Sequence, residues 1–353
     1  MTTSIKVRWL LILIGLIHSV GAAAVDVTLP QVFVSADIPI MKVADFHLKT
    51  SRAFAAAVHD DRYIYVIGGQ SAVGAALNSV ERFDTTTGES ENFATLKTAR
   101  FWHQAVLREG KIYVLGGVDG SSSQHPVFDS VEIVDLATRQ ISMGPKMPLP
   151  RQQFGCVAFR DDLYVIGGRT SAEGTVTNSM QIYSFTSGKW RKGVPMPKPK
   201  ETGALLVYSP FILFPGTSAP EANHRIILSA RPLIVAPGGY NGEELDEMEV
   251  FDLESMRWGR LPPVCRKVSA YSIVQMKGYL FFFGSYNHAD ELIAYDLKTK
   301  ASESFTLNYR PVRHTAAVVV NGKVYVIGGK VAPTPTAARN YVQVFAPPPR
   351  GLP

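Results

Sequence analysis

Basic residues recur at a nearly fixed distance before a pair of glycines. Arg52, Arg100 and Arg151 stand at the same distance before the first glycine of such a pair, and Arg313 stands one position closer to its own. Lys200 has similar neighbours at a longer distance. Guanidinium groups bind carboxylates and phosphates through parallel hydrogen bonds. A set of these side chains, brought together by a repeat, predicts a site for an anion or an acidic peptide.

One histidine close to the second of these residues joins the predicted site. The candidate ligand- or partner-binding residues are Arg52, Arg100, His103, Arg151, Lys200 and Arg313. In the fifth repeat Arg266 is the best match, although it stands farther from its glycine than the others do. The alternative for each arginine is a structural role, because a guanidinium also donates hydrogen bonds to loop carbonyls. The residues alone leave both roles open.

The histidines and cysteines do not have the spacing of a metal site or a catalytic site. The histidines near this region are His103, His125, His288 and His314. They lack the spacing of a metal site, and two cysteines are too few for a Cys-based zinc site. We expect Cys156 and Cys265 to be buried thiols in separate strands. No catalytic residue, metal or cofactor is therefore assigned.

The composition is that of a folded protein without the charge pattern of a nucleic-acid binder. Of 353 residues, 46% are hydrophobic and 19% are charged, which excludes an intrinsically disordered chain. The formal net charge of +6 is mild for this length and forms neither a tail nor a stripe. We expect partners to be proteins or anionic ligands, and the chain to be a monomer.

The first 24 residues have the features of a secretory signal peptide. Lys6 and Arg8 precede the apolar run 9–17, and Ala22-Ala23-Ala24 provides a small-residue cleavage site. The run is shorter than the roughly 20 residues that a membrane-spanning helix needs. We therefore expect cleavage near Ala24, no membrane span afterwards, and a secreted or periplasmic protein.

A repeat of about fifty residues organises the rest of the chain. Apolar runs ending in Gly-Gly begin their glycines at positions 68, 116, 167, 238 and 328, and a degraded copy ends in Gly284-Ser285. Each copy follows a small-residue strand and precedes a strand such as Val80–Asp84 and, in most copies, a fourth strand with a large residue such as Trp190. Four short strands without helical periodicity form one antiparallel sheet, and six such sheets can bury one another when they are arranged radially.

Polar residues also recur near the third strand. They are Glu81, Glu132, Gln181, Glu249 and Asp290. Recurrence at one repeat position favours a packing role over catalysis.

These features resemble the kelch repeat: a basic residue, a diglycine after an apolar strand, an aromatic-Asp strand, then a large residue and a proline-rich link. The resemblance covers about residues 40–350 and implies an all-β fold, a six-bladed β-propeller of four-stranded blades in one domain, 25–353. Kelch domains of ubiquitin-ligase adaptors use arginines at this repeat position to bind acidic peptides. The resemblance carries that role best to Arg100 and Arg151.

Two departures from the repeat allow specific structural expectations. The last repeat ends at its third strand, so an N-terminal strand, in 32–39 or 40–48, is expected to complete the last blade and close the ring. The fourth repeat holds a 22-residue excess within about 209–231. We expect a long loop there and a second strand that ends at Gly238, with Phe211–Phe214 as the alternative second strand.

A non-enzymatic binding module, engaging its partner at a basic channel mouth, is the favoured function. The alternative is a carbohydrate-active enzyme of the sialic acid mutarotase type, since that family comprises exported kelch propellers of similar size. A carboxylate pointing into the channel would favour the enzyme, and an open, purely basic mouth would favour the binding module. A galactose-oxidase-like copper site is disfavoured because the ring is one blade short.

Overall fold

The computed structural model describes residues 39–120, 126–171, 174–208, 231–306, 308–331 and 338–348. The predicted signal peptide, most of the first closing-strand alternative (32–39), His125 and nearly all of the excess in the fourth repeat lie outside these residues.

In the part of the chain that the structure describes, twenty-four strands form six four-stranded antiparallel sheets. Blade one is β2 (Ala56–His59), β3 (Tyr63–Ile67), β4 (Ser79–Asp84) and β5 (Ser90–Thr95), and blade two is β6 (Gln104–Arg108), β7 (Lys111–Leu115), β8 (Val131–Asp135) and β9 (Ile141–Met143). Blade three is β10 (Gly155–Phe159), β11 (Asp162–Ile166), β12 (Met180–Ser184) and β13 (Lys189–Lys192), and blade four is β14 (Leu206–Tyr208), β15 (Leu233–Pro237), β16 (Met248–Asp252) and β17 (Arg257–Leu261). Blade five is β18 (Ser272–Met276), β19 (Tyr279–Phe283), β20 (Glu291–Asp296) and β21 (Ser302–Thr306), and blade six is β22 (Ala316–Val320), β23 (Lys323–Ile327), β24 (Tyr341–Ala346) and β1 (Met41–His47).

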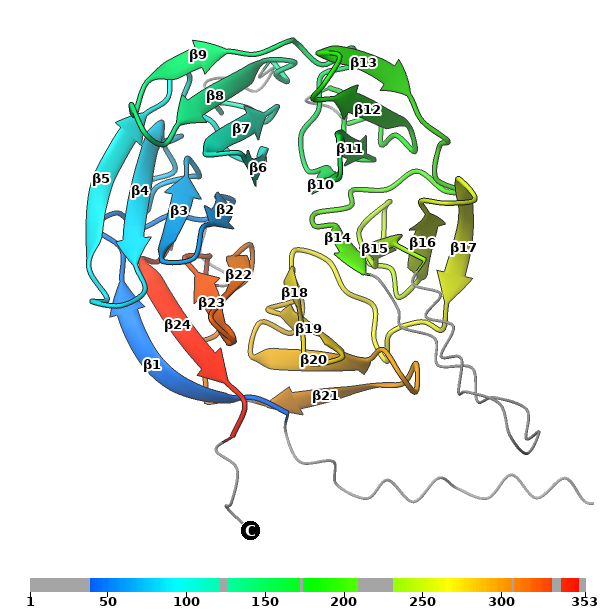
Figure 1. Ribbon diagram of the computed structural model, residues 1–353. Coiled ribbons are helices and arrows are strands. Elements are labelled where there is room, and N and C mark those ends of the chain that lie inside the picture. The colour runs from blue at the N-terminus through cyan, green and yellow to red at the C-terminus, as the bar shows by residue number, and fades with distance from the viewer. Residues whose placement is uncertain are drawn as a thin grey trace, which may run out of the picture. The chain divides into compact units, whose positions relative to one another are not determined.

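The blades close into a ring with the first strand of each innermost (Figure 1). Neighbouring innermost strands contact one another all the way round, from β2 through β6, β10, β14 and β18 to β22 and back to β2. The apolar cores lie between blades; in one of them Ile64 and Val66 of blade one pack with Tyr325 of blade six. The chain is therefore a six-bladed β-propeller, as the repeats predict.

The diglycines are explained by the close passage of the next blade's connection. Gly68 and Gly69 have φ values of 53° and 99°, a region that other residues rarely adopt. A Cβ on Gly68 would lie 2.6 Å from the carbonyl oxygen of Arg100, and the Gly69 N–H donates to that same oxygen at 2.8 Å. The repeat thus requires glycine where two blades meet.

The ring closes through the N-terminal strand. β1 pairs antiparallel with β24, from Met41 opposite Ala346 to His47 opposite Tyr341, and Figure 1 shows the two strands side by side. This confirms the 40–48 alternative.

In blade four, β14 pairs with β15, which places Leu233–Pro237 as the second strand. The expected second strand ending at Gly238 is therefore confirmed, whereas Phe211–Phe214 and the predicted loop lie outside the described residues.

The two cysteines differ in their exposure to solvent. Cys156 is buried in β10, as expected, but Cys265 is exposed. The expectation for Cys265 is wrong because this residue lies outside the strands, in the link between blades four and five. Its N–H donates a hydrogen bond to Ser302 Oγ there.

Within the described part of the chain, no helix is long and apolar enough to cross a membrane.

Candidate functional site

The recurring basic side chains do not lie at the channel mouth. Arg52, Arg100, Arg151 and Lys200 are all 0% exposed, and His103 is 2% exposed. Each basic side chain turns into its own blade, where for example Arg100 Nη1 donates to the carbonyl oxygen of Gly116 at 2.8 Å. This corrects the predicted placement of Arg52, Arg100, Arg151 and Lys200, which hold the end of the second strand inside the blade. His103 differs from them, because it is among the residues that line a cavity at the centre of the ring.

Three of these buried cations are neutralised by buried carboxylates from the third strand. Arg52 pairs with Glu81 at 2.5 Å, and Arg100 pairs with Glu132 at 2.7 Å. The third pair is Lys200 with Glu249, at 2.9 Å. Burial lowers the pKa of Arg52, Arg100 and Lys200, and the paired carboxylates partly offset this. The packing role expected for the recurring glutamates agrees with this geometry.

Blade three keeps the arginine but has no carboxylate at the paired position. Arg151 donates to the carbonyl oxygen of Gly167 at 2.6 Å and to Ser179 Oγ at 2.7 Å, while Gln181 occupies the position of the glutamate. Burial lowers the pKa of Arg151 to about 10.

Blades five and six replace the buried basic residue by valine. The Gly239 N–H donates to the carbonyl oxygen of Val268, as Gly69 does to that of Arg100, so Val268 is the fifth-blade equivalent. The equivalent in blade six is Val312, which stands as far before its diglycine as Arg100 stands before the diglycine of blade two. Neither Arg266 nor Arg313 has the repeat position that the sequence assigned to it.

In blades five and six, the third-strand position that holds the paired glutamate elsewhere also has a different residue. Ile293 occupies the glutamate position in blade five and Gln343 occupies it in blade six. Asp290, which the sequence placed in this series, lies outside the third strand.

A cavity of about 790 Å³ opens at the centre of the ring. First-strand residues of five blades line its wall, and blade four contributes the residues just before β14. Many of the lining residues are alanines, such as Ala57, Ala105 and Ala316. Small side chains are required here because six strands converge. This cavity is the candidate functional site.

In five of the six blades, one residue in left-handed conformation builds the rim of the cavity. These residues are Phe54, Trp102, Gln153, Ala270 and His314, with φ between 53° and 58°. Backbone hydrogen bonds join neighbouring rim residues, for example from Trp102 N–H to Phe54 O at 3.2 Å and from Gln153 N–H to Trp102 O at 3.1 Å. The rim is thus held by the backbone, and its side chains vary freely in type.

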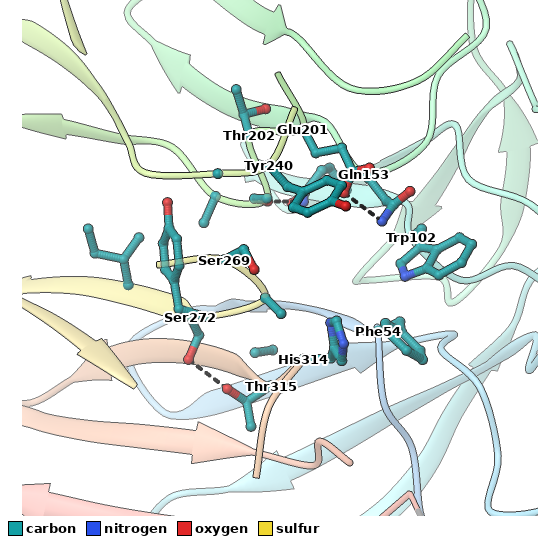
Figure 2. A pocket seen from close by; sticks show the side chains of 18 of the residues that line it. Phe54, Trp102, Gln153, Glu201, Thr202, Tyr240, Ser269, Ser272, His314 and Thr315 are labelled. Carbon is teal, nitrogen blue, oxygen red and sulfur yellow. Dashed lines mark hydrogen bonds between the residues drawn. The ribbon is translucent and has the colours of Figure 1, made fainter. Parts of the chain in front are cut away.

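One arc of the rim is aromatic (Figure 2). The ring centroids of Phe54 and His314 are 4.3 Å apart, and those of Phe54 and Trp102 are 5.3 Å apart. Burial, with the nearby charges of Arg313 and Lys330, lowers the pKa of His314 to about 3. Burial and the charge of Arg100 likewise lower the pKa of His103 to about 3, so both histidines are neutral near pH 7.

Carboxylates also line the cavity. Glu201 accepts hydrogen bonds from Gln153, at 2.9 Å, and from Arg169, and burial raises its pKa although Arg169 opposes this shift. Glu243 and Glu244 also line the cavity, and Glu243 is paired with Lys267. The mouth therefore carries both signs of charge and is not the purely basic surface that would have favoured the binding module.

Two cations lie beside the aromatic arc. Arg313 and Lys330 face each other across an antiparallel bridge between the two blade-six segments. The Arg313 guanidinium stacks on Tyr286, 3.7 Å from the ring centroid, and Nη1 donates to the Tyr286 carbonyl oxygen at 3.0 Å. Lys330 Nζ lies 5.6 Å from the centroid of the Phe54 ring. Arg313 is thus the one sequence-predicted cation that reaches the surface around the cavity.

The sequence search missed the rim residues and the cavity carboxylates. Rim residues stand two places after the buried basic or valine residue, so their position is periodic even though their types are not. Among the residues described, no group of three His, Cys, Asp or Glu side chains could hold a metal ion.

Comparison with known proteins finds similarity to kelch-repeat proteins. The profile of the KLHDC2/KLHL20/DRC7 kelch-repeat domain matches residues 53–284. The chain is 24% identical to Kelch-like protein 25 of Xenopus tropicalis over 235 residues, which cover 65% of this chain and 36% of the relative. It is 23% identical to human Kelch-like protein 38 over 274 residues (76% and 42%) and 26% identical to Beta-scruin of Limulus polyphemus over 199 residues (55% and 20%).

The chain spans less than half the length of these relatives. The profile covers about two thirds of the chain. The chain belongs to the kelch-repeat protein family.

Proposed function

We propose that this propeller is a non-enzymatic interaction module that binds an acidic segment of a partner protein on the face around the cavity. The observation that carries the proposal is the pair Arg313 and Lys330: among the described residues, neither side chain forms an ion pair with a carboxylate. Burial and the neighbouring Arg313 charge lower the pKa of Lys330. A bound carboxylate would relieve this repulsion, and the stacking on Tyr286 fixes the plane of the guanidinium for a two-point contact.

Arg313→Ala and Lys330→Ala are expected to weaken binding of acidic peptides by about tenfold each, the effect of losing one charge-assisted contact. The measurement compares an array of twelve-residue peptides rich in Asp and Glu with their Asn and Gln counterparts, at low and high salt. The purified chain should prefer the acidic set, and added salt should reduce the preference.

Lys323→Ala is the matched control, because Lys323 is an exposed lysine at the other end of β23 in the same blade. It should bind acidic peptides like the unchanged chain. Equal retention of acidic and neutral peptides would contradict the proposal, as would equal losses in the Lys323 and Lys330 variants.

A second candidate, a carbohydrate-active enzyme of the sialic acid mutarotase type, is favoured by one observation. Glu201 is a carboxylate in the cavity whose pKa is raised by burial, which is the condition for a general acid or base near neutral pH. Sialic acid mutarotation, followed by nuclear magnetic resonance, tests it. Turnover that Glu201→Gln abolishes would establish the enzyme, and no acceleration over the spontaneous rate would exclude this activity.

We further propose that the protein is secreted or periplasmic and that residues 1–24 are removed. The support is the Lys6 and Arg8 region, the short apolar run and the alanine site that follow one another in the sequence. N-terminal sequencing of the protein recovered from the cell exterior or periplasm should start near Val25. Recovery only from the cell interior with Met1 in place would refute the proposal.

A further inference from the structure

A short segment of blade five connects one carboxylate and one guanidinium at the cavity. The segment is Ser285-Tyr286-Asn287, and the exposed Tyr286 side chain stands at its centre. On one side the Tyr286 ring and carbonyl oxygen hold Arg313. On the other side Ser285 Oγ and Asn287 Nδ2 donate hydrogen bonds to Glu244. The two opposite charges are therefore held by neighbouring residues of the same segment.

Glu244 is fixed in place without being neutralised. Its three hydrogen-bond donors are Ser269 Oγ at 2.8 Å, Ser285 Oγ at 3.3 Å and Asn287 Nδ2, and all three are uncharged. Within the described parts of the chain, no cation forms an ion pair with Glu244. These bonds orient the carboxylate at the cavity wall without pairing it with a cation.

The adjacent carboxylate differs in one decisive respect. Glu243 is paired with Lys267, so these two charges cancel locally. The largest cause of the raised pKa of Lys267 is its hydrogen bond to Glu243, with a smaller contribution from the charge of Glu244. Two successive glutamates of the cavity wall thus offer an internal comparison: Glu243 is paired with a cation, and Glu244 is held only by uncharged donors.

We infer that the face around the cavity recognises a bipolar segment, in which a carboxylate contacts Arg313 and Lys330 and a nearby lysine or arginine of the same partner contacts Glu244. The inference rests on the proposed binding of an acidic segment and adds a second, opposite requirement. Tyr286, 47% exposed between the two charges, offers a ring edge or face to the apolar part of either side chain. A purely acidic segment would satisfy only half of this surface.

The test uses peptides in which the charge pattern is the only variable. One fixed Glu is combined with Lys, Gln or Glu at each offset from one to six residues on either side, and binding to the purified full chain is measured by fluorescence polarisation. The unchanged protein should bind the best Glu-and-Lys peptides about fivefold more tightly than the matching Glu-and-Gln peptides, as expected for one additional ion pair.

Variants of the two glutamates distinguish the site from general electrostatics. Glu244→Gln should remove the preference for lysine while keeping the preference for the fixed glutamate. Glu244→Lys should reverse it in favour of a second acidic residue. Glu243→Gln, which removes the same charge from the neighbouring position, should keep the lysine preference.

The outcomes separate this inference from the proposed function. If acidic peptides bind through Arg313 but an added lysine has no effect at any offset, or has an effect that Glu243→Gln removes equally, the bipolar inference is wrong and the proposed function stands. If no acidic peptide is preferred over its neutral counterpart, both are wrong. Melting curves of the variants that match the unchanged protein exclude misfolding as the cause.

Discussion

Arg100→Met is expected to lower the free energy of unfolding by about 3–5 kcal/mol, the cost of leaving one partner of a buried ion pair without its counterion. The substitution keeps most of the side-chain volume but leaves Glu132, which is 0% exposed, without its cation. It also removes the hydrogen bond to the carbonyl oxygen of Gly116. Urea denaturation followed by tryptophan fluorescence gives the difference.

Blade five shows which apolar residues can replace the buried ion pair. Val268 and Ile293 occupy the positions that hold Arg100 and Glu132 in blade two, so the fold accepts an apolar pair there. The double variant Arg100→Val/Glu132→Ile is expected to recover most of the loss and to remain within about 2 kcal/mol of the unchanged protein. It does not recover fully, because Glu132 also accepts hydrogen bonds from the backbone N–H groups of Lys97 and Thr98.

A double-mutant cycle tests directly whether the Arg100 and Glu132 side chains are energetically coupled. The two single substitutions should be strongly non-additive, because each leaves a buried charge that the other removes. Arg191→Met, which breaks the solvent-exposed pair with Asp162, is the control and should change stability far less. Additive losses in the double variant would contradict the interpretation of these pairs as coupled structural elements.

The fold could be predicted because its requirements are tied to residue type. Glycine is required where the next blade's connection passes within 2.6 Å of a hypothetical Cβ, as at Gly68, so the repeat is marked in the sequence wherever two blades meet. The missing fourth strand of the last repeat likewise requires a strand from the other end of the chain. Both features predict the six-bladed ring and its closure correctly.

The site could not be predicted in the same way, because a periodic arginine is equally compatible with a ligand site and with a buried ion pair. The sequence held one further indication: Arg52, Arg100 and Lys200 have a glutamate at the paired third-strand position, whereas Val268 has Ile293 there. This correlated change favours an internal pair over a surface site.

A shift of one position in the sequence places Arg313 at the surface and not inside the blade. It stands one position closer to its diglycine than Arg100 does, and therefore one position after Val312, where the chain emerges at the cavity rim. The rim side chains vary from tryptophan to alanine between blades, because the backbone alone forms the turn. Residue type therefore gave no periodic signal for the surface that the partner would contact.

Removal of the closing strand is expected to have an even larger effect than loss of a buried ion pair. A chain beginning at Lys49 lacks β1, and with it Ile40 and Leu48, which are 0% and 2% exposed. Removing large buried side chains costs about 2–5 kcal/mol each, before the lost ladder to β24 is counted. The melting temperature should fall by on the order of 10 °C or more, and the exposed edge of β24 should promote aggregation.

A chain beginning at Pro39 is the matched control, since it retains β1 and lacks only residues that precede the ring. It should melt like the longer chain, whereas the chain beginning at Lys49 should not. A synthetic peptide of residues 39–48 should bind the shortened chain and raise its melting temperature, because the β24 edge and the contact between Leu48 and Asn340 then become available again. If both shortened chains melted alike, ring closure through β1 would contribute little, and blade six would have to be stable with three strands.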